Sequence, residues 1–420
     1  MMRILVLTHR LPYAPNRGDR LRMYHMLQHL RGRADVDLVS FVHDDEEAAH
    51  AGELRSLAAR VTTVRVPKWR NRLNAAATLW TDRPLTHALL DAPGFTRILT
   101  RLVDEHPPDV VLAYCSGMAR FAMQPPLDRI PMVLDFVDVD SRKWKDLAGT
   151  ARAPVSWIYR REARTLGAFE AAAAARAATA LVVNDREAAN ARALAPSADV
   201  RVVLNGVDID RLRPPHAPSP QPTVVFCGMM DYQPNHDGMM WFVRAVWPLV
   251  RAARTDATLT IVGANPLRPL TRLCADDPSI TVTGRVDDVR DWVWNAAVAI
   301  APLQVARGVQ NKALEAIAAG LPIVITDAVA GGLPRSAATA SLVANAPDTF
   351  AAHVVALLNR SAPERRAMAE SCDFAALKWS GTLEKFWGIL EQAATSRRAA
   401  VMNAPSTLGS PRPAALPWGR

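Results

Sequence analysis

The sequence has few of the residues that define several large classes of protein. Only 4 of its 420 residues are cysteine. They stand far apart and form no C-x-x-C pair, which excludes a disulfide-rich scaffold and a zinc site with recognised ligand spacing. Reduced thiols in a cytosolic protein without a bound metal are therefore expected. Aromatic residues make up 6% of the chain, although its 11 tryptophans outnumber its 5 tyrosines.

Long apolar segments are missing as well. No stretch of 18 apolar residues is free of charge, since even the alanine-rich run at 171–183 is interrupted by Arg176. A membrane-spanning helix is therefore not expected. The apolar run before His9 has only five residues. This is too short for a signal peptide and predicts a first strand instead.

The net charge of +9 is unevenly distributed. The excess of Lys and Arg lies in residues 1–211 and in the tail, 395–420, whereas residues 212–394 hold 16 charges of each sign. This pattern argues against a nucleic-acid-binding stripe and is compatible with weak attraction to an anionic membrane surface. The runs at 68–72 and 157–161 mix aromatic and cationic residues, as segments at a membrane interface do. An ordinary exposed loop and an amphipathic helix explain the two runs equally well.

A chain of this length is expected to form two domains. The first is assigned to residues 1–205 and is completed by a C-terminal helix at 375–394. A proline-rich hinge at 206–222 leads to the second domain, 223–374. The tail, 395–420, is rich in Pro, Ala, Ser and Arg and is expected to be disordered.

Within both domains, short apolar strands alternate with helices. The expected strands are 3–8, 36–42, 61–66, 109–113, 131–136, 180–183 and 200–204, then 223–227, 258–262, 280–283, 298–301 and 323–325. The expected helices are 21–30, 46–59, 155–178, 236–254, 287–295, 311–319, 350–358, 362–371 and 375–394. This alternation predicts an α/β fold with two doubly wound, Rossmann-like domains that face each other across a cleft. Ligands of such sheets bind at the carboxyl ends of the strands, so the cleft is the expected site.

The stretch at 301–326 is the most informative part of the chain. It predicts a loop that turns at Gly308, then a helix that begins near Asn311 with this residue as its cap, then a buried strand. Gly320 is placed to end the helix in the left-handed conformation. The order of loop, helix and strand puts a helix N-terminus at the edge of a parallel sheet.

Such a helix N-terminus favours a phosphate group, because its free N–H groups and partial positive charge point at the ligand. Arg307 and Lys312 add two cations at the same end. Glu315 follows one turn into the helix, where its carboxylate could accept hydrogen bonds from the hydroxyls of a sugar. The stretch therefore predicts a site for a nucleotide sugar.

These residues resemble the donor site of glycosyltransferase family 4, whose members have the GT-B fold. The likeness rests on Pro302-Leu303, Gly308, Lys312-x-Leu314-Glu315-Ala316, Gly320-x-Pro322 and the run at 203–208, which is a typical crossing point between the two domains. Four phrases, at 15–20, 135–141, 228–235 and 307–312, are closer still to sugar transferases encoded with exosortase and PEP-CTERM exopolysaccharide clusters. The likeness covers roughly residues 1–395.

The resemblance implies roles for residues of the donor domain. Glu315 would bind the nucleotide ribose, and Val286 lies where the family contacts the nucleobase. Gly228 and Gly284 match the glycine turns at the strand ends. Gly308 and Asn311, at the start of the helix, are assigned to donor binding with them.

The resemblance also implies roles in the acceptor domain. Arg17, Gly18 and Asp19 match a loop that reaches into the cleft and are assigned to acceptor binding. Asp138 is chosen as the carboxylate near the acceptor hydroxyl, although a hydrogen-bonded turn explains it about as well. The family often has a histidine in this region, and this chain has none there. Members are generally retaining and metal-independent, so no cofactor and no metal are expected.

The chain departs from the family pattern where the diphosphate is held. The family usually has two glutamates eight positions apart, and here the first of them is replaced by Arg307. Met229 stands where an arginine is common after the first glycine turn, and residues 231–237 lack the usual lysine. We infer that Arg307 and Lys312 supply the charge from the other side of the site. Both are therefore assigned catalytic roles together with Asp138.

The expected function is retaining, metal-independent transfer of a sugar from a nucleoside-diphosphate sugar to an exopolysaccharide acceptor on a lipid carrier. The expected location is the cytoplasm, with peripheral contact to the inner membrane as an option. Two alternatives remain: a non-hydrolysing sugar-nucleotide epimerase, and a catalytically degenerate sugar-nucleotide-binding protein. Release of free nucleoside diphosphate in the presence of a membrane extract separates the transferase from the epimerase.

Overall fold

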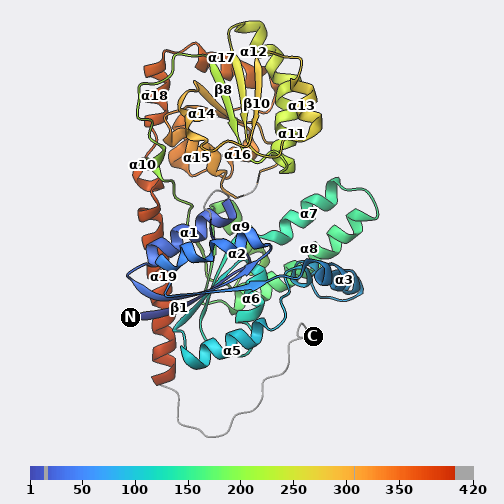
Figure 1. The fold of residues 1–420 in the computed structure, drawn as a ribbon, viewed down its shortest axis with the longest axis vertical. Helices are drawn as coiled ribbons and strands as arrows, with labels where there is room; N and C mark the ends of the chain where they lie inside the picture. The colour runs from blue at the N-terminus through green and yellow to red at the C-terminus, as the bar shows by residue number, and fades with distance from the viewer. Residues whose placement is uncertain (14–17, 307, 403–420) are drawn as a thin grey trace. The chain divides into compact units, whose positions relative to one another are not determined.

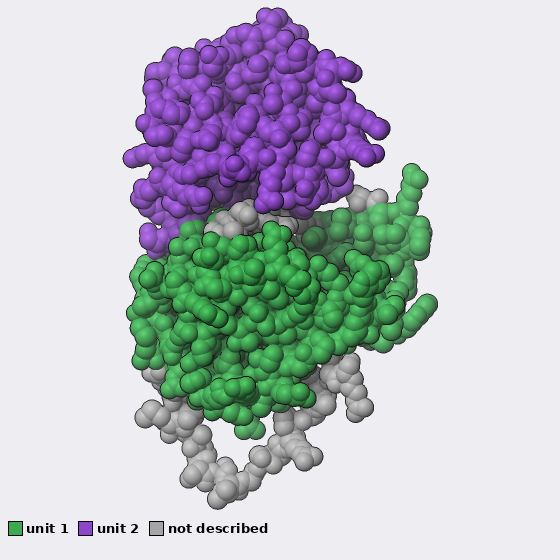
Figure 2. Space-filling model, viewed as in Figure 1, with its two compact units in different colours: residues 1–203, 383–420 green, residues 204–382 purple. Residues whose placement is uncertain are grey.

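The computed structural model describes residues 1–13, 18–306 and 308–402. The chain forms two compact units: unit 1 consists of Met1–Val203 with the segment from Leu383 onward, and unit 2 of Leu204–Thr382 (Figure 2). Each unit is built around an all-parallel sheet with helices on both sides (Figure 1). The predicted α/β class with two Rossmann-like domains is confirmed.

Unit 1 contains a seven-stranded sheet in the order β3-β2-β1-β4-β5-β6-β7. Its strands are β1 (Met2–Thr8), β2 (Ala34–Val42), β3 (Arg60–Arg65), β4 (Val110–Tyr114), β5 (Met132–Val137), β6 (Thr179–Val182) and β7 (Val200–Val202). All five residues of the central strand β4 are buried. Burial on both faces explains why the strands are continuous apolar runs rather than alternating ones.

The helices of unit 1 connect these strands. They are α1 (Gly18–Leu30), α2 (Asp45–Ala49), η1 (His50–Ser56), α3 (Lys68–Ala77), η2 (Thr78–Trp80), α4 (Leu85–Leu89), α5 (Phe95–Glu105), α6 (Ser116–Ala122), α7 (Asp140–Thr150), α8 (Val155–Arg176) and α9 (Asp185–Leu194). The order of the strands reverses direction between β1 and β4, so the carboxyl ends of these two strands flank the switch point of unit 1.

Unit 2 contains a six-stranded sheet in the order β10-β9-β8-β11-β12-β13. Its strands are β8 (Thr223–Cys227), β9 (Thr258–Val262), β10 (Ile280–Gly284), β11 (Val298–Ala301), β12 (Ile323–Ile325) and β13 (Ser341–Val343). Here the order reverses between β8 and β11. Ligands of open α/β sheets bind outside the carboxyl ends of the strands at such a reversal.

The helices of unit 2 cover both faces of this sheet (Figure 1). They are α10 (Ile209–Leu212), α11 (Gln233–Trp241), η3 (Phe242–Val246), α12 (Trp247–Ala253), α13 (Arg268–Cys274), α14 (Arg290–Trp294), α15 (Asn311–Ala318), α16 (Asp327–Ala330), η4 (Arg335–Ala340), α17 (Pro347–Leu358), α18 (Ala362–Glu370) and η5 (Ala375–Leu377). The last helix, α19 (Trp379–Met402), begins in unit 2 and continues in unit 1.

The part of α19 in unit 1 is attached to α1 and its C-terminal turn. Both terminal nitrogens of Arg33 bond the carboxylate of Glu384, at 3.0 and 2.6 Å. Part of the segment expected to be a hinge, 206–222, is regular structure in unit 2: it contains α10, and the amide of Val207 donates to the carbonyl of Leu377 at 2.7 Å.

Several expectations about local structure were wrong. The single helix expected at 236–254 is interrupted by η3, a π-helical turn, before α12 starts with Pro248 in its first turn. Proline has no N–H to donate to the preceding turn, so the hydrogen-bond pattern must change there. The helix expected at 46–59 is the short α2 followed by η1. Strand β13, Ser341–Val343, was missed because it has only two apolar residues and is partly exposed, whereas the equally short β12 is an entirely apolar run.

The predicted tail begins too early. Residues expected to be disordered from 395 onward continue the last helix as far as Met402. The rest of the predicted tail, 403–420, lies outside the described residues. None of the described helices combines the length and apolar composition that crossing a membrane requires. All four cysteines are free, as expected.

Candidate donor site

The loop and helix between β11 and β12 lie at the switch point of unit 2. Helix α15 begins at Asn311 and ends before Gly320, whose φ of 81° is in the left-handed region. The predicted end of the helix is therefore confirmed. The predicted cap is wrong: Gln310 is the N-cap residue and makes no side-chain capping bond. The side chain of Asn311 instead accepts a hydrogen bond from Asn205 Nδ2 at 3.2 Å.

The loop before α15 turns at Gly308, which is buried and has a φ of 58°. A residue with a side chain would be strained in this conformation, so glycine is required for the turn. Arg307, which was predicted to hold the diphosphate, lies outside the described residues. The described cation at this end of the helix is Lys312.

The ammonium of Lys312 reaches the carboxyl end of β8. It bonds Asn235 Oδ1 and lies 4.9 Å from the centroid of the Phe226 ring. Asn235 in turn donates from Nδ2 to the carbonyl of Met229 at 2.8 Å. Burial lowers the pKa of Lys312 to about 8. The charged form of an ammonium that is removed from water and bonded to a neutral side chain is stabilised by any anion that binds beside it.

Gly228 is required by this arrangement. A Cβ atom at Gly228 would come within 2.7 Å of Asn235 Nδ2 and 3.2 Å of Lys312 Nζ. Gly263, at the end of β9, is even more restricted, because a Cβ atom there would lie 1.8 Å from the carbonyl oxygen of Gly228. The sequence did not reveal Gly263 or the role of Asn235, because neither forms a local pattern with Lys312.

Glu315 lies one turn further along α15, as predicted. Burial raises the pKa of its carboxyl, while Lys312 and Arg211 act in the opposite direction. Glu315 and Lys312 line a small cavity of about 30 Å³ together with Leu212, Val225, Cys227, Val289, Arg290, Val293, Trp294, Ala299, Ile300, Ala316, Ala319 and Ile323. A cavity of this size holds about two water molecules. The structure thus brings the predicted cation and the predicted carboxylate to one mostly apolar place.

The other two predicted donor residues lie at the end of β10. Gly284 has a φ of 69°, and no atom lies within 4 Å of the place where its Cβ would be. Its glycine is therefore required by backbone conformation rather than by crowding. The side chain of Val286 is half-buried and packs against the core of unit 2. Neither residue is among those that line the cavity beside Glu315.

In unit 1, the predicted acceptor residues lie at the start of α1. Gly18 and Asp19 form the first turn of this helix. Arg17 and the side chain of Asp19 lie outside the described part of the chain. Nearby in the sequence, Arg22 makes a fully buried ion pair with Asp135, with 2.8 Å between Nε and Oδ2. Arg22 also donates to the carbonyl of Val203, and Asp135 also accepts from the amide of Val137. These bonds inside unit 1 give Asp135 a structural role.

Asp138 follows β5, after a Val137 with a φ of 64°. Its Oδ1 is buried and accepts no hydrogen bond from the residues that the structure describes. Burial, and then the nearby carboxylates of Glu187 and Asp140, raise the pKa of Asp138 to about 7. A carboxyl group in this state takes up or releases a proton near neutral pH, which is what a general base requires.

Another carboxyl of unit 1 with a raised pKa, Glu170 on α8, was not predicted. It accepts a hydrogen bond from the amide of Ser141 at 3.2 Å, and burial, followed by Asp140, raises its pKa to about 8. Its position on a long alanine-rich helix carries no sequence signal for this contact. No group of three or more His, Cys, Asp or Glu side chains in the described ranges is arranged to hold a metal ion.

Comparison with known proteins is consistent with this picture. Residues 221–360 match the family model described as glycosyl transferases group 1. No curated protein sequence matches the chain. The matched segment contains β8 to β13, and therefore Lys312, Glu315 and Gly228.

Solved structures resemble nearly the whole chain. Sucrose-phosphate synthase from Thermosynechococcus elongatus is 16% identical, covers 94% of this chain and 100% of its own, and gives a TM-score of 0.67. HepE from Anabaena, solved in complex with UDP, is 14% identical, covers 93% and 100%, and gives 0.63. TarM from S. aureus, solved with UDP, is 10% identical, covers 93% and 100%, and gives 0.65. The chain has the GT-B fold, and its second unit carries a glycosyl transferases group 1 domain, which together support a glycosyltransferase enzyme.

Proposed function

We propose that the protein transfers a sugar from a nucleoside-diphosphate sugar to a lipid-linked precursor of an exopolysaccharide. The proposal rests above all on the buried ammonium of Lys312, placed at the start of α15 and beside Gly228. A diphosphate there would meet a desolvated cation and the free N–H groups of a helix. Glu315, one turn away, would accept hydrogen bonds from the ribose. HepE, which shares the fold, was solved with UDP.

In this transfer, the bond between the sugar C1 and the diphosphate oxygen breaks while the acceptor oxygen bonds to C1. Negative charge accumulates on the leaving diphosphate, where Lys312 and the α15 amides would stabilise it. Loss of one such donor typically raises the barrier by about 3 kcal/mol. Arg307, which lies outside the described residues, is proposed to add a second cation. Attack on the face from which the diphosphate leaves gives retention, and no metal is needed because the cations are protein side chains.

Asp138 is proposed to receive the proton of the acceptor hydroxyl. Its raised pKa, about 7, matches a base that works near neutral pH. Its buried Oδ1 accepts no hydrogen bond from the described residues, so this oxygen is available to accept a proton. Gly18 and Asp19, the first residues of α1, are proposed to contact the acceptor together with Arg17, which lies outside the described residues.

The membership in family 4 and the link to PEP-CTERM and exosortase exopolysaccharide systems belong to the same proposal. The family 4 proposal rests on the motifs at 203–208 and 302–324, and the link to exopolysaccharide systems rests on the phrases at 15–20, 135–141, 228–235 and 307–312. The proposed location is the cytoplasm, with peripheral contact at the inner membrane.

The test is a panel of nucleoside-diphosphate sugars offered with a lipid extract of bacterial inner membranes. The expected result is release of free nucleoside diphosphate together with a sugar-labelled lipid, unaffected by a metal chelator. Anomeric configuration in the product, read by NMR, decides between retention and inversion. An epimerase would instead interconvert the sugars and release no diphosphate in proportion to a lipid product.

The second candidate, a sugar-nucleotide-binding protein without activity, is favoured by one observation. The family commonly has two cations after the first glycine turn, and this chain lacks both: Met229 replaces the arginine, and residues 231–237 contain no lysine. In the structure, the neutral Asn235 of that segment contacts Lys312. Saturable binding of a nucleotide sugar without turnover on any acceptor of the panel would support this candidate over the transferase.

A further inference from the structure

Unit 1 carries a group of exposed tryptophans away from its switch point. Trp69 on α3 is 79% exposed, Trp80 on η2 is 85% exposed and Trp157 on α8 is 50% exposed. The rings of Trp80 and Trp157 lie side by side, with 6.2 Å between their centroids. Leu73 and Val155 are exposed next to them in the sequence. We call these five residues the tryptophan patch; Figure 1 shows α3 beside α8.

The amphipathic pattern of α3 is inverted. Trp69 and Leu73, four residues apart on one face, are exposed, whereas the polar Asn71 is buried. Asn71 Nδ2 donates to the carbonyls of Leu89 and Asp91, at 3.0 and 2.6 Å. A surface helix of a soluble protein normally buries its large apolar residues. Exposed apolar groups on this scale, rimmed by polar residues, mark an interaction surface.

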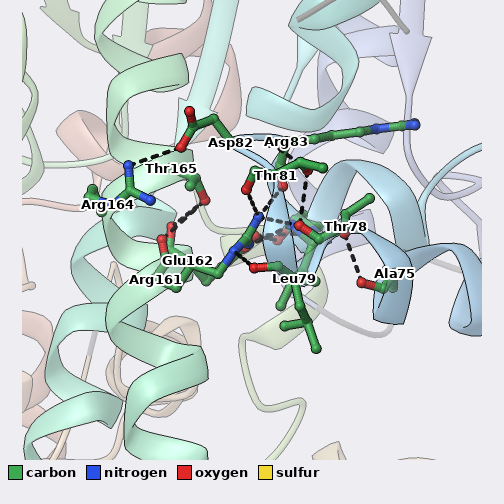
Figure 3. A network of polar contacts seen from close by, with 12 residues as sticks. Ala75, Thr78, Leu79, Thr81, Asp82, Arg83, Arg161, Glu162, Arg164 and Thr165 are labelled. Atoms are coloured by element: carbon green, nitrogen blue, oxygen red, sulfur yellow. Dashed lines mark hydrogen bonds and ion pairs between the residues drawn. The ribbon is translucent and has the colours of Figure 1, made fainter.

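Buried polar contacts hold the patch in place. Figure 3 shows Arg161 of α8 reaching into the carbonyl groups around η2. Its guanidinium donates to the carbonyls of Thr78 at 2.6 Å, Leu79 at 2.9 Å and Arg83 at 2.9 Å, and also to that of Thr81. The position of Trp80 is therefore set by hydrogen bonds on its inner side, although its ring is exposed.

The adjacent Glu162 fixes the next turn. Its carboxylate accepts from the amides of Leu85 and Thr86, at 2.7 and 2.9 Å, and from the Thr86 hydroxyl at 2.7 Å. One residue pair on α8 thus anchors both the end of α3 and the start of α4. A surface held in this way presents its tryptophans in a defined arrangement, so they are not the side chains of a loose loop.

The charges around the patch are mostly of one sign. Helix α3 contributes Lys68, Arg70 and Arg72, all exposed, and no acidic residue. The guanidinium of Arg72 lies 5.5 Å from the centre of the Trp69 ring. Around the start of α8 stand the exposed Arg152, Arg160 and Arg164. Carboxylates lie beside some of these cations: Asp82 is paired with Arg164 at 3.1 Å, and Asp91 lies 3.5 Å from Arg70.

We propose that the tryptophan patch docks unit 1 on the surface of an anionic phospholipid bilayer. Tryptophan rings, with an apolar body and one polar N–H, settle at the boundary between headgroups and acyl chains. Cations beside them complement anionic headgroups. The match of both ring type and charge sign favours a lipid surface over an acidic protein or a second copy of the chain. This inference rests on the proposed function, since membrane docking would bring the enzyme to its lipid-linked acceptor. Docking itself can be measured without any sugar transfer.

The test is co-sedimentation of the full chain with vesicles of equal parts phosphatidylcholine and phosphatidylglycerol, and with vesicles of phosphatidylcholine alone. The wild type is expected to bind the first and not the second, less well as salt is raised. Replacing both Trp69 and Trp80 by Ala is expected to lower binding on the order of tenfold or more. The matched control is Trp292→Ala, an exposed tryptophan on α14 of unit 2.

The contribution of charge is tested separately. Lys68→Gln is expected to lower binding about fivefold, whereas Lys385→Gln, an exposed lysine on α19, leaves it unchanged. Absence of binding to the anionic vesicles would overturn the proposal, as would equal binding by the tryptophan variant. If sedimentation shows that the wild type self-associates and the tryptophan variant does not, with no vesicle binding, the patch is a contact between copies. None of these outcomes depends on whether the donor or the acceptor has been identified.

Discussion

Raising the pH from about 7 to about 9 is expected to weaken the binding of a nucleoside diphosphate about tenfold, through Lys312. Burial lowers the pKa of this lysine to about 8 in the free protein, so its ammonium is mostly charged at the lower pH and mostly neutral at the higher. A diphosphate at the start of α15 favours the charged form and raises that pKa. Binding above pH 8 therefore takes up a proton, and affinity decreases as the pH increases.

The groups around Lys312 do not explain a change in UDP affinity between pH 7 and pH 9, so such a change is assigned to Lys312. Burial raises the pKa of Cys227 on β8 to about 12, so this thiol stays protonated. Arg290 stays charged throughout, because its hydrogen bond to Asp288 raises its already high pKa. Burial also raises the pKa of Glu315, so the control must leave Glu315 in place and change the lysine alone.

Isothermal titration calorimetry with UDP as the probe measures both quantities. Titrations in two buffers with different ionisation enthalpies give the number of protons taken up per UDP, expected to approach one near pH 9. The control, Lys312→Arg, keeps the charge but does not titrate in this range, so its affinity should be flat with pH. The reasoning is refuted if wild type and Lys312→Arg show the same pH dependence, or if UDP binds without proton uptake.

Three further predictions concern other parts of the structure. Gly228→Ala would force Asn235 and Lys312 apart and is expected to lower kcat/KM of the identified transfer on the order of 100-fold, with unchanged far-UV circular dichroism. Glu170→Gln should gain stability relative to wild type as the pH rises from about 5 to about 8, by about 1 kcal/mol per pH unit in urea melts. Burial raises the folded-state pKa of Glu170 to about 8, so in this range the wild-type carboxyl ionises in the unfolded state but stays protonated in the folded state, whereas Gln ionises in neither. Parallel curves would contradict this. Arg161→Ala removes the guanidinium bonds to four carbonyls and should cost about 3 kcal/mol, seen as faster amide hydrogen exchange in α3 and α4, whereas the exposed Arg160→Ala should change stability by less than about 0.5 kcal/mol. Equal exchange in the two arginine variants would count against the anchoring role.

The departures from the family pattern look different once the geometry is known. The segment after Gly228 lacks a lysine, but its Asn235 bonds Lys312, which follows the neighbouring parallel strand β11. The described cation near the glycine turn thus comes from α15 rather than from the β8 loop. This arrangement is in line with the inference, drawn from the sequence, that the loop and helix at 301–326 supply charge that relatives take from elsewhere. It leaves Arg307 as the residue whose role only mutagenesis addresses.

The sequence by itself determined the features that depend on near neighbours. The inner strands of both sheets follow from short apolar runs, because they are buried on both faces, and the end of α15 follows from Gly320, because few residues other than glycine tolerate its φ of 81°. The placement of Lys312 and Glu315 beside one cavity also follows, since residues three apart on a helix share a face.

Only the tertiary structure decided what surrounds those residues. Burial lowers the pKa of Lys312, and it places the ammonium beside Phe226 and Asn235, which are far away in the sequence. The inverted pattern of α3 is stable because Asn71 finds carbonyl partners beyond η2. Burial, hydrogen bonding and pKa are set by groups that come into contact only when distant strands and helices pack. A local pattern of residues therefore does not predict them.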